Sequence, residues 1–202
     1  MAKSIEKRKK SGTEDAWWPR PVRGGECVEA GEERHIISVL VLNEFGVLTR
    51  VAGLFSGRGY NIESLSVAET ANPEISRMTI VTTGEAAVIE QIIKHLRKLI
   101  PVLKVVDVTD KPHVERELLL LKVRATEENK NEIFRLVDIF RARIIDVSPN
   151  SYVIELTGDP DKLNVFIDLF RNMGLLEVAR TGIVSLQRGR VTLKEYDPKK
   201  EV

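Results

Sequence analysis

One order of strands and helices occurs twice in this 202-residue chain, and that repetition limits the possible folds more than any other property. The apolar periodicity predicts a first set of strand, helix, strand, strand, helix and strand at residues 34–42, 47–58, 62–69, 76–83, 85–99 and 103–108. The same order returns at residues 118–125, 132–140, 143–147, 152–156, a helix from Asp159 and Pro160 to Gly174, and one strand or a pair of strands over 175–186. Two βαββαβ sets of about 75 residues each predict an α+β protein built from two tandem ferredoxin-like domains.

The breaks in this pattern predict the domain boundaries. Residues 1–33 are polar, glycine-rich and aperiodic, so we expect a flexible leader. The first domain is expected at 34–109, a short linker containing Pro112 at 110–116, the second domain at 117–188 and a charged tail at 189–202.

The leader also raises a hypothesis about translation. Residues 23–26, Arg-Gly-Gly-Glu, can be encoded by a purine-rich ribosome-binding sequence, and Val28 can be encoded by the start codon GUG. Residues before Val28 are then untranslated in the native cell. The alternative, translation from Met1, stays open because a protein sequence does not reveal its codons.

Composition argues against several classes of partner. The 31 basic and 30 acidic residues give a net charge of +1, which supplies no broad field for nucleic acid or an anionic membrane. No run approaches the roughly 20 apolar residues of a membrane span. The chain has a single cysteine, Cys27, which excludes an internal disulfide. One cysteine also provides too few thiolate ligands for a structural zinc site. We therefore expect a cytoplasmic protein that binds neither nucleic acid nor membrane.

No catalytic or metal-binding residues are predicted. His35, His95 and His113 fall on different predicted elements, and none has a metal-spaced partner. Cys27 lies in the leader, where a nucleophile has no preorganised base. Residues 57–59, Gly-Arg-Gly, follow a helix instead of opening one, so they predict a helix C-cap with left-handed glycines and not a dinucleotide site.

The turn between the first strand and the first helix is the candidate binding feature. Residues 43–50 read Asn-Glu-Phe-Gly-Val-Leu-Thr-Arg, and a helix start carries unpaired N–H groups and about half a positive charge. Gly46 has no side chain to shield those groups, so the turn can bind a carboxylate or phosphate. Asn43 and Gly46 could equally only cap the helix. The polar Asn61, which begins an otherwise apolar strand, favours a binding site.

Four segments of the chain resemble the small, regulatory subunit of acetolactate synthase (acetohydroxyacid synthase). They read NEFGVLTRVAGLFSGRGYNIESLSV, SRMTIVTTG, HVERELLLLKV and EVARTGIVSLQRG, and the resemblance runs from Arg34 to about Gly189. It implies an N-terminal ACT domain that binds a branched-chain amino acid, usually valine, and a second domain that helps activate a large catalytic subunit. It also implies a role in branched-chain amino acid biosynthesis. No cofactor is expected in this chain, because thiamine diphosphate, Mg²⁺ and FAD belong to the catalytic subunit.

The resemblance places the effector on Asn43, Gly46, Asn61 and Ile62, with the backbone of Val47 and Leu48. Helix N–H groups then hold the carboxylate, the two asparagines supply oriented amides, and apolar neighbours hold the side chain. Phe45 is bulkier than the small residue expected before the glycine, so leucine or isoleucine remain alternatives to valine.

Helix length predicts that the site is shared between two chains. About thirteen helical residues separate Gly46 from Gly59, which is roughly 20 Å and longer than valine. A twofold dimer that pairs the strands beginning at Asn61 would instead place each Asn61 beside the partner's Gly46. Two other functions stay open, a stand-alone enzyme and an ACT regulator of another enzyme or of transcription. The first lacks a catalytic constellation and the second lacks a helix-turn-helix segment.

Overall fold

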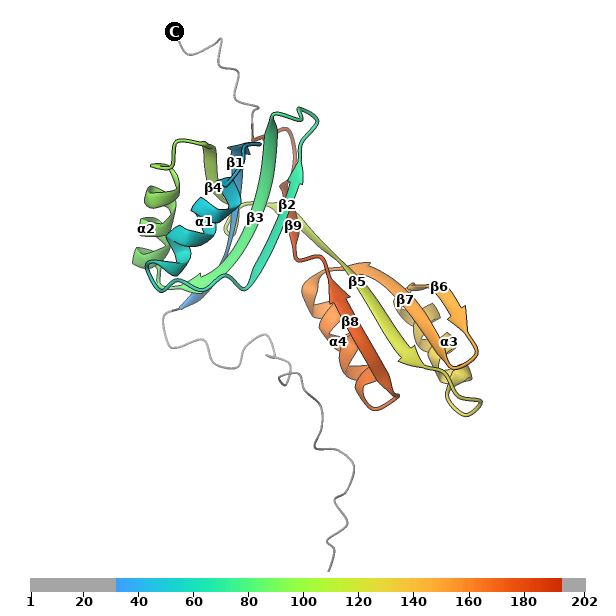
Figure 1. Ribbon diagram of the computed structural model, residues 1–202. Helices are drawn as coiled ribbons and strands as arrows, with labels where there is room; N and C mark the ends of the chain where they lie inside the picture. Colours follow the sequence, from blue (N-terminus) through green and yellow to red (C-terminus); the bar gives the residue numbers. More distant parts are fainter. Residues whose placement is uncertain (1–31, 194–202) are drawn as a thin grey trace, which may run out of the picture.

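The computed structural model describes residues 32–193 and confirms the predicted tandem of βαββαβ units (Figure 1). The first unit contains β1 (Glu33–Leu42), α1 (Val47–Ser56), β2 (Ser64–Glu69), β3 (Ile75–Gly84), α2 (Ala86–Leu96) and β4 (Val102–Asp107). The second contains β5 (His113–Arg124), α3 (Lys130–Phe140), β6 (Arg143–Ser148), β7 (Ser151–Gly158), α4 (Pro160–Arg171), β8 (Leu175–Arg180) and β9 (Val184–Gln187). The hypothesis about a start at Val28 lies outside the described residues.

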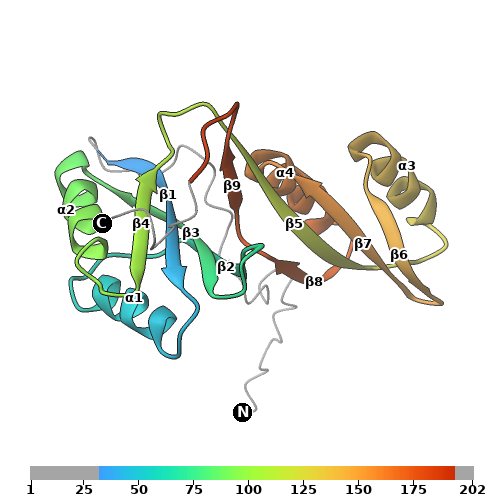
Figure 2. The same cartoon turned by 90° about the horizontal axis from the view of Figure 1, so that it is seen from above.

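The first unit is a four-stranded antiparallel sheet in the order β2-β3-β1-β4, with β2 at one edge. Ile37 pairs with Ile80 and Val39 with Met78, and strand alternation points these side chains to one face. Helices α1 and α2 cover that face (Figure 2). The core between them consists mainly of aliphatic residues, namely Ile37, Val39, Val41, Val47, Val51, Phe55, Met78, Ile80, Ile89, Ile92, Leu96 and Val105.

The second unit repeats this arrangement in the order β6-β7-β5-β8, with α3 and α4 on one face (Figure 2). Its core contains a cluster of three phenylalanines. The ring of Phe166 lies 5.0 Å from that of Phe140 and 4.7 Å from that of Phe170. The predicted start of α4 is confirmed, since the Asp159 side chain accepts a hydrogen bond from the Lys162 backbone N–H at 2.9 Å.

The boundary between the units differs from the expected linker at 110–116. Strand β5 begins at His113, and its first four residues pair with β9, from His113 opposite Gln187 to Arg116 opposite Val184. The apolar pattern over 175–186 therefore corresponds to two strands, separated at Gly182, whose φ is +79°. Sequence periodicity missed the start of β5 because residues 113–117 are mostly charged or polar.

Helix α1 is shorter than predicted and ends at Ser56. Gly57 has φ −67°, which is right-handed, so the expectation that both glycines after the helix are left-handed is wrong for Gly57. Gly59, with φ +72°, does adopt the left-handed conformation that reverses the chain toward β2.

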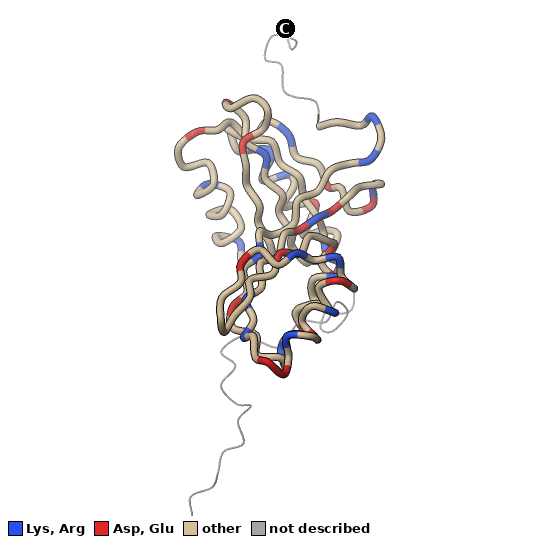
Figure 3. The backbone as a smooth tube through the Cα atoms, turned by 90° about the vertical axis from the view of Figure 1, so that its right-hand side faces the viewer, with Lys and Arg blue, Asp and Glu red and all other residues tan. Residues whose placement is uncertain are grey.

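Charged residues of both signs are distributed over both units (Figure 3). Between residues 32 and 193, no helix is long and apolar enough to cross a membrane.

Candidate functional site

The turn between β1 and α1 is an open helix start. The chain leaves β1 at Leu42, and the backbone N–H of Asn43 donates to the carbonyl of Glu74 at 2.7 Å, which anchors the turn to the sheet. Gly46 is the N-cap residue, with φ +81° and ψ 2°, and no side chain caps the helix. A Cβ atom placed on Gly46 would meet nothing within 4 Å. Among residues 32–193, no atom therefore occupies the space where a side chain at position 46 would begin.

The first N–H groups of α1 are available to a ligand. The Val47 N–H makes only a long contact of 3.4 Å with the carbonyl of Glu44. Within residues 32–193, the N–H groups of Gly46, Leu48 and Thr49 have no protein acceptor. Together with the positive end of the helix dipole, these groups favour an anion.

The side chain of Asn43 has a free acceptor and no free donor. Its Nδ2 donates to Glu69 Oε1 at 3.1 Å and to the carbonyl of Pro73 at 2.9 Å, so both amide hydrogens are used. The Oδ1 atom has no protein donor within residues 32–193 and remains able to accept. Glu69 was not among the residues predicted for the site. Its only signal was a carboxylate at the last position of the strand that begins near Asn61.

Apolar side chains surround the helix start and continue along the sheet edge. Phe45 is fully exposed, and Leu48 and Val67 are 46% and 41% exposed. Val67 lies on β2, the edge strand, which pairs only with β3 among the described residues. Exposed large apolar side chains beside a free strand edge are typical of a surface that is buried in an assembly.

Asn61 and Ile62 lie at the other end of the sheet. The Asn61 carbonyl accepts a hydrogen bond from Thr82 Oγ1 at 2.6 Å, and its side chain is exposed. Ile62 is partly buried against the core of the first unit. Glu74, which precedes β3 and accepts the Asn43 hydrogen bond, is eight residues from Thr82 near the end of that strand, or about 26 Å. One chain therefore does not bring the two asparagines together, in agreement with their predicted separation.

The three histidines are scattered, as the sequence predicts. The ring of His35 hydrogen-bonds Asp107 Oδ2 at 2.8 Å, and the other oxygen of Asp107 accepts from the N–H and hydroxyl of Thr109. Burial raises the pKa of Asp107, but these hydrogen bonds outweigh it and hold the pKa below its ordinary value. Among residues 32–193, no three His, Cys, Asp or Glu side chains are grouped to hold a metal ion.

Comparisons with known proteins identify both units. A family model described as "Small subunit of acetolactate synthase" matches residues 116–189, and one described as "AHAS small subunit-like ACT domain" matches residues 37–104. The chain is 50% identical over 179 residues to the acetolactate synthase small subunit of Aquifex aeolicus, covering 88% of this chain and 90% of the relative. It is also 50% identical over 157 residues to the acetolactate synthase isozyme 3 small subunit of Escherichia coli, covering 77% and 96%.

A solved structure agrees with these sequence relationships. The crystal structure of the acetolactate synthase small subunit from Thermotoga maritima superposes with a TM-score of 0.73 at 45% identity, covering 79% of this chain and 99% of that one. The fold, both family models and the relatives all agree on one family. The chain belongs to the acetolactate synthase small-subunit family, with an ACT domain as its first unit.

Proposed function

We propose that this chain is the regulatory subunit that activates the large catalytic subunit of acetolactate synthase and makes it sensitive to valine. The observation that carries the proposal is the open helix start at Gly46, next to the free acceptor of Asn43. The chain itself supplies no covalent chemistry in this function. Thiamine diphosphate, Mg²⁺ and FAD are assigned to the large subunit.

The chemical groups at the turn complement the backbone of an amino acid. The N–H groups of Gly46, Leu48 and Thr49, which have no other acceptor among residues 32–193, receive the carboxylate. The ammonium group donates to Asn43 Oδ1 and lies near the carboxylate of Glu69, which Asn43 already contacts at 3.1 Å. Apolar side chains such as Leu48 and the partner's Ile62 enclose the isopropyl group.

The proposed site is completed by a second copy of the chain. Strand β2 is a sheet edge, and antiparallel pairing of two β2 strands places the start of one strand beside the end of the other. Asn61 lies just before β2, whereas Glu69 ends it and contacts Asn43. The partner's Asn61 therefore approaches Asn43 and Gly46, and a twofold dimer has two equivalent sites.

The proposal is tested by mixing the purified chain with its cognate large subunit. We expect the chain to raise acetolactate formation, valine to reverse much of that activation, and calorimetry on the chain alone to give two valines per dimer. Leucine and isoleucine are titrated in parallel to establish which effector is preferred. Acetolactate formation by this chain without a partner, or activation without an effect of any branched-chain amino acid, would contradict the proposal.

A further inference from the structure

Strand β5 has two sets of strand partners. Its first residues, from His113 to Arg116, pair with β9, and the residues from Glu117 onward pair with β7, while those from Leu119 also pair with β8. The β5–β9 ribbon lies against the face of the first sheet that α1 and α2 leave uncovered (Figure 2). The first unit is therefore covered on its second face by residues from the C-terminal part of the chain.

The contact between ribbon and sheet is buried. Ile183, which is 5% exposed, packs in one cluster with Ile36, Val81 and Val108 of the first unit. Arg77 of β3 donates through Nη2 to the carbonyl of Ser185 at 2.7 Å, and burial lowers the pKa of this guanidinium group. Apolar packing and a charged hydrogen bond thus fix β9 to the sheet.

A further contact lies at Ser64, the first residue of the edge strand β2. Ser64 Oγ accepts a hydrogen bond from the Ile183 N–H at 3.1 Å. A Cβ atom on Gly182 would lie 2.8 Å from Ser64 Oγ and 3.3 Å from the Leu65 carbonyl oxygen, so only glycine fits here without displacement. Ser64 is three residues after Asn61, which makes this contact adjacent to the proposed effector site.

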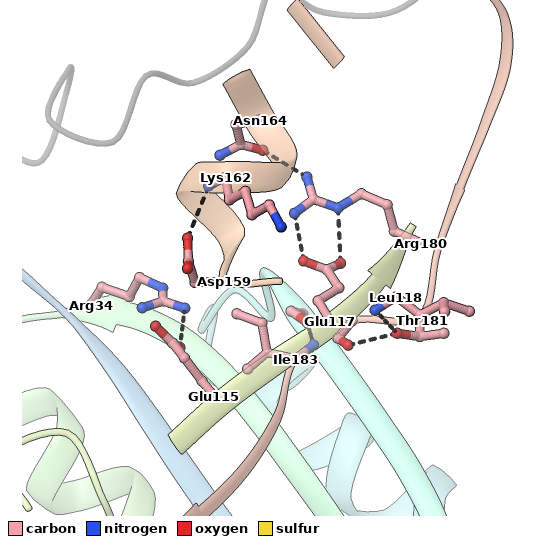
Figure 4. A network of polar contacts seen from close by, with 12 residues as sticks. Arg34, Glu115, Glu117, Leu118, Asp159, Lys162, Asn164, Arg180, Thr181 and Ile183 are labelled. Atoms are coloured by element: carbon pink, nitrogen blue, oxygen red, sulfur yellow. Dashed lines mark hydrogen bonds and ion pairs between the residues drawn. The ribbon is translucent and has the colours of Figure 1, made fainter. Parts of the chain in front are cut away.

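The same segment is tied on its other side to the second unit (Figure 4). Arg180 donates to both oxygens of Glu117, from Nε at 2.8 Å and from Nη2 at 2.5 Å, and Glu117 is only 4% exposed. Arg180 also donates to Asn164 of α4 at 2.9 Å. The Thr181 hydroxyl accepts from the Leu118 N–H at 3.1 Å. Residues 180–183 therefore join β2 to the second unit through consecutive hydrogen bonds.

We infer that residues 180–183 position the start of β2 for the effector and transmit effector binding to the second unit. The inference deepens the proposed function and rests on it. Ser64 and Gly182 act as positioning residues, because they touch the strand that carries Asn61 and not the effector. Effector binding orders the start of β2. The hydrogen bond between Ser64 and Ile183 then also orders residues 180–183, including the Arg180–Glu117 pair.

Amide hydrogen exchange on the full chain, with and without saturating valine, tests the inference first. We expect valine to slow exchange of the Ile183 amide and of its neighbours over 181–185 by at least about threefold, because their acceptors become more ordered. Valine binding by calorimetry without any change at these amides would overturn the inference. Absence of valine binding would instead refute the proposed function, so the two failures are distinguishable.

Two glycine variants provide the second test, in the complex with the large subunit. Gly182→Ala places a methyl group against Ser64, whereas Gly189→Ala is a matched control with φ +77° and no atom within 4 Å. We expect Gly182→Ala to lose most valine inhibition while activation stays within about twofold of the control. Equal inhibition of both variants would overturn the inference. Should Gly182→Ala fail to fold, Ser64→Ala removes the hydrogen bond from the Ile183 N–H without backbone strain, and the same two outcomes apply.

Discussion

Asn43 and Asn61 lie at opposite ends of β3 within one chain, since Asn43 is bonded to Glu74 before the strand and Asn61 to Thr82 near its end. A shared site predicts complementation between variants. Asn43→Ala and Asn61→Ala should each weaken valine binding at least about tenfold as homodimers, from the loss of one hydrogen bond to a charged group. Mixing the two variants should restore one tight site per heterodimer, measured by calorimetry after subunit exchange. A mixture that binds no better than either parent would place the site within one chain.

Gly46→Asp should abolish feedback inhibition. The new carboxylate stands in front of the helix N–H groups that receive the effector carboxylate, and hydrogen bonds to charged groups contribute about 1.5–3 kcal/mol each. Losing two of them weakens valine binding by at least about 100-fold. Gly189→Asp adds the same charge at another left-handed, open glycine and serves as the control for backbone strain. Unchanged valine affinity of Gly46→Asp in calorimetry would exclude this position.

Val67→Lys should convert the chain to monomers at micromolar concentration, measured by analytical ultracentrifugation. Val67 is 41% exposed on edge strand β2, and two lysines facing one another across a twofold axis repel. Val147→Lys makes the same change on β6, the edge of the other sheet, where the valine is 67% exposed. If the Val147 variant dissociates and the Val67 variant does not, the dimer forms through the second unit.

Asp107 should give the stability a specific pH dependence. Its folded-state pKa is lowered from the ordinary 3.8, so its stabilising contribution is complete above pH 3.8 and is lost as the pH falls through the lower, folded-state value. Asp107→Asn should therefore lower the free energy of unfolding at pH 6, and the difference from wild type should shrink toward pH 3. Urea denaturation measures this, with the exposed Asp110→Asn as control. A difference independent of pH would show that the charge is unimportant.

Sequence periodicity predicted the elements whose apolar side chains face one core. Ile37, Val39 and Val41 alternate along β1, and the stripe on α2 includes the buried Ile89, Ile92 and Leu96, so both could be identified without a structure. The pairing of His113 to Arg116 with β9 could not be predicted. It depends on backbone hydrogen bonds, which do not require a particular type of side chain. For the same reason Gly182, Ser64 and Ile183 gave no local signal, since they are distant in sequence.

The candidate site was predictable in part. Gly46 and Asn43 stand where a strand becomes a helix, and that position follows from local sequence. Glu69 was not predictable, because its contact with Asn43 depends on how the β2–β3 hairpin folds back beside the turn. The hydrogen bonds that the Asn43 amide donates likewise depend on the tertiary structure.

Because Ile183 and β9 follow the second repeat in the chain but pack on the first, no single peptide bond divides the chain into two complete repeats. An excised first repeat would leave Ile36, Val81 and Val108 without Ile183, so such a fragment would present a new apolar surface to solvent. Chimaeras that exchange effector domains between relatives should accordingly carry residues 183–187 together with the first repeat. Substitutions at Ile183 should then be accompanied by compensating changes at Val81 and Val108, more than 70 residues away in sequence, as the chain diverges.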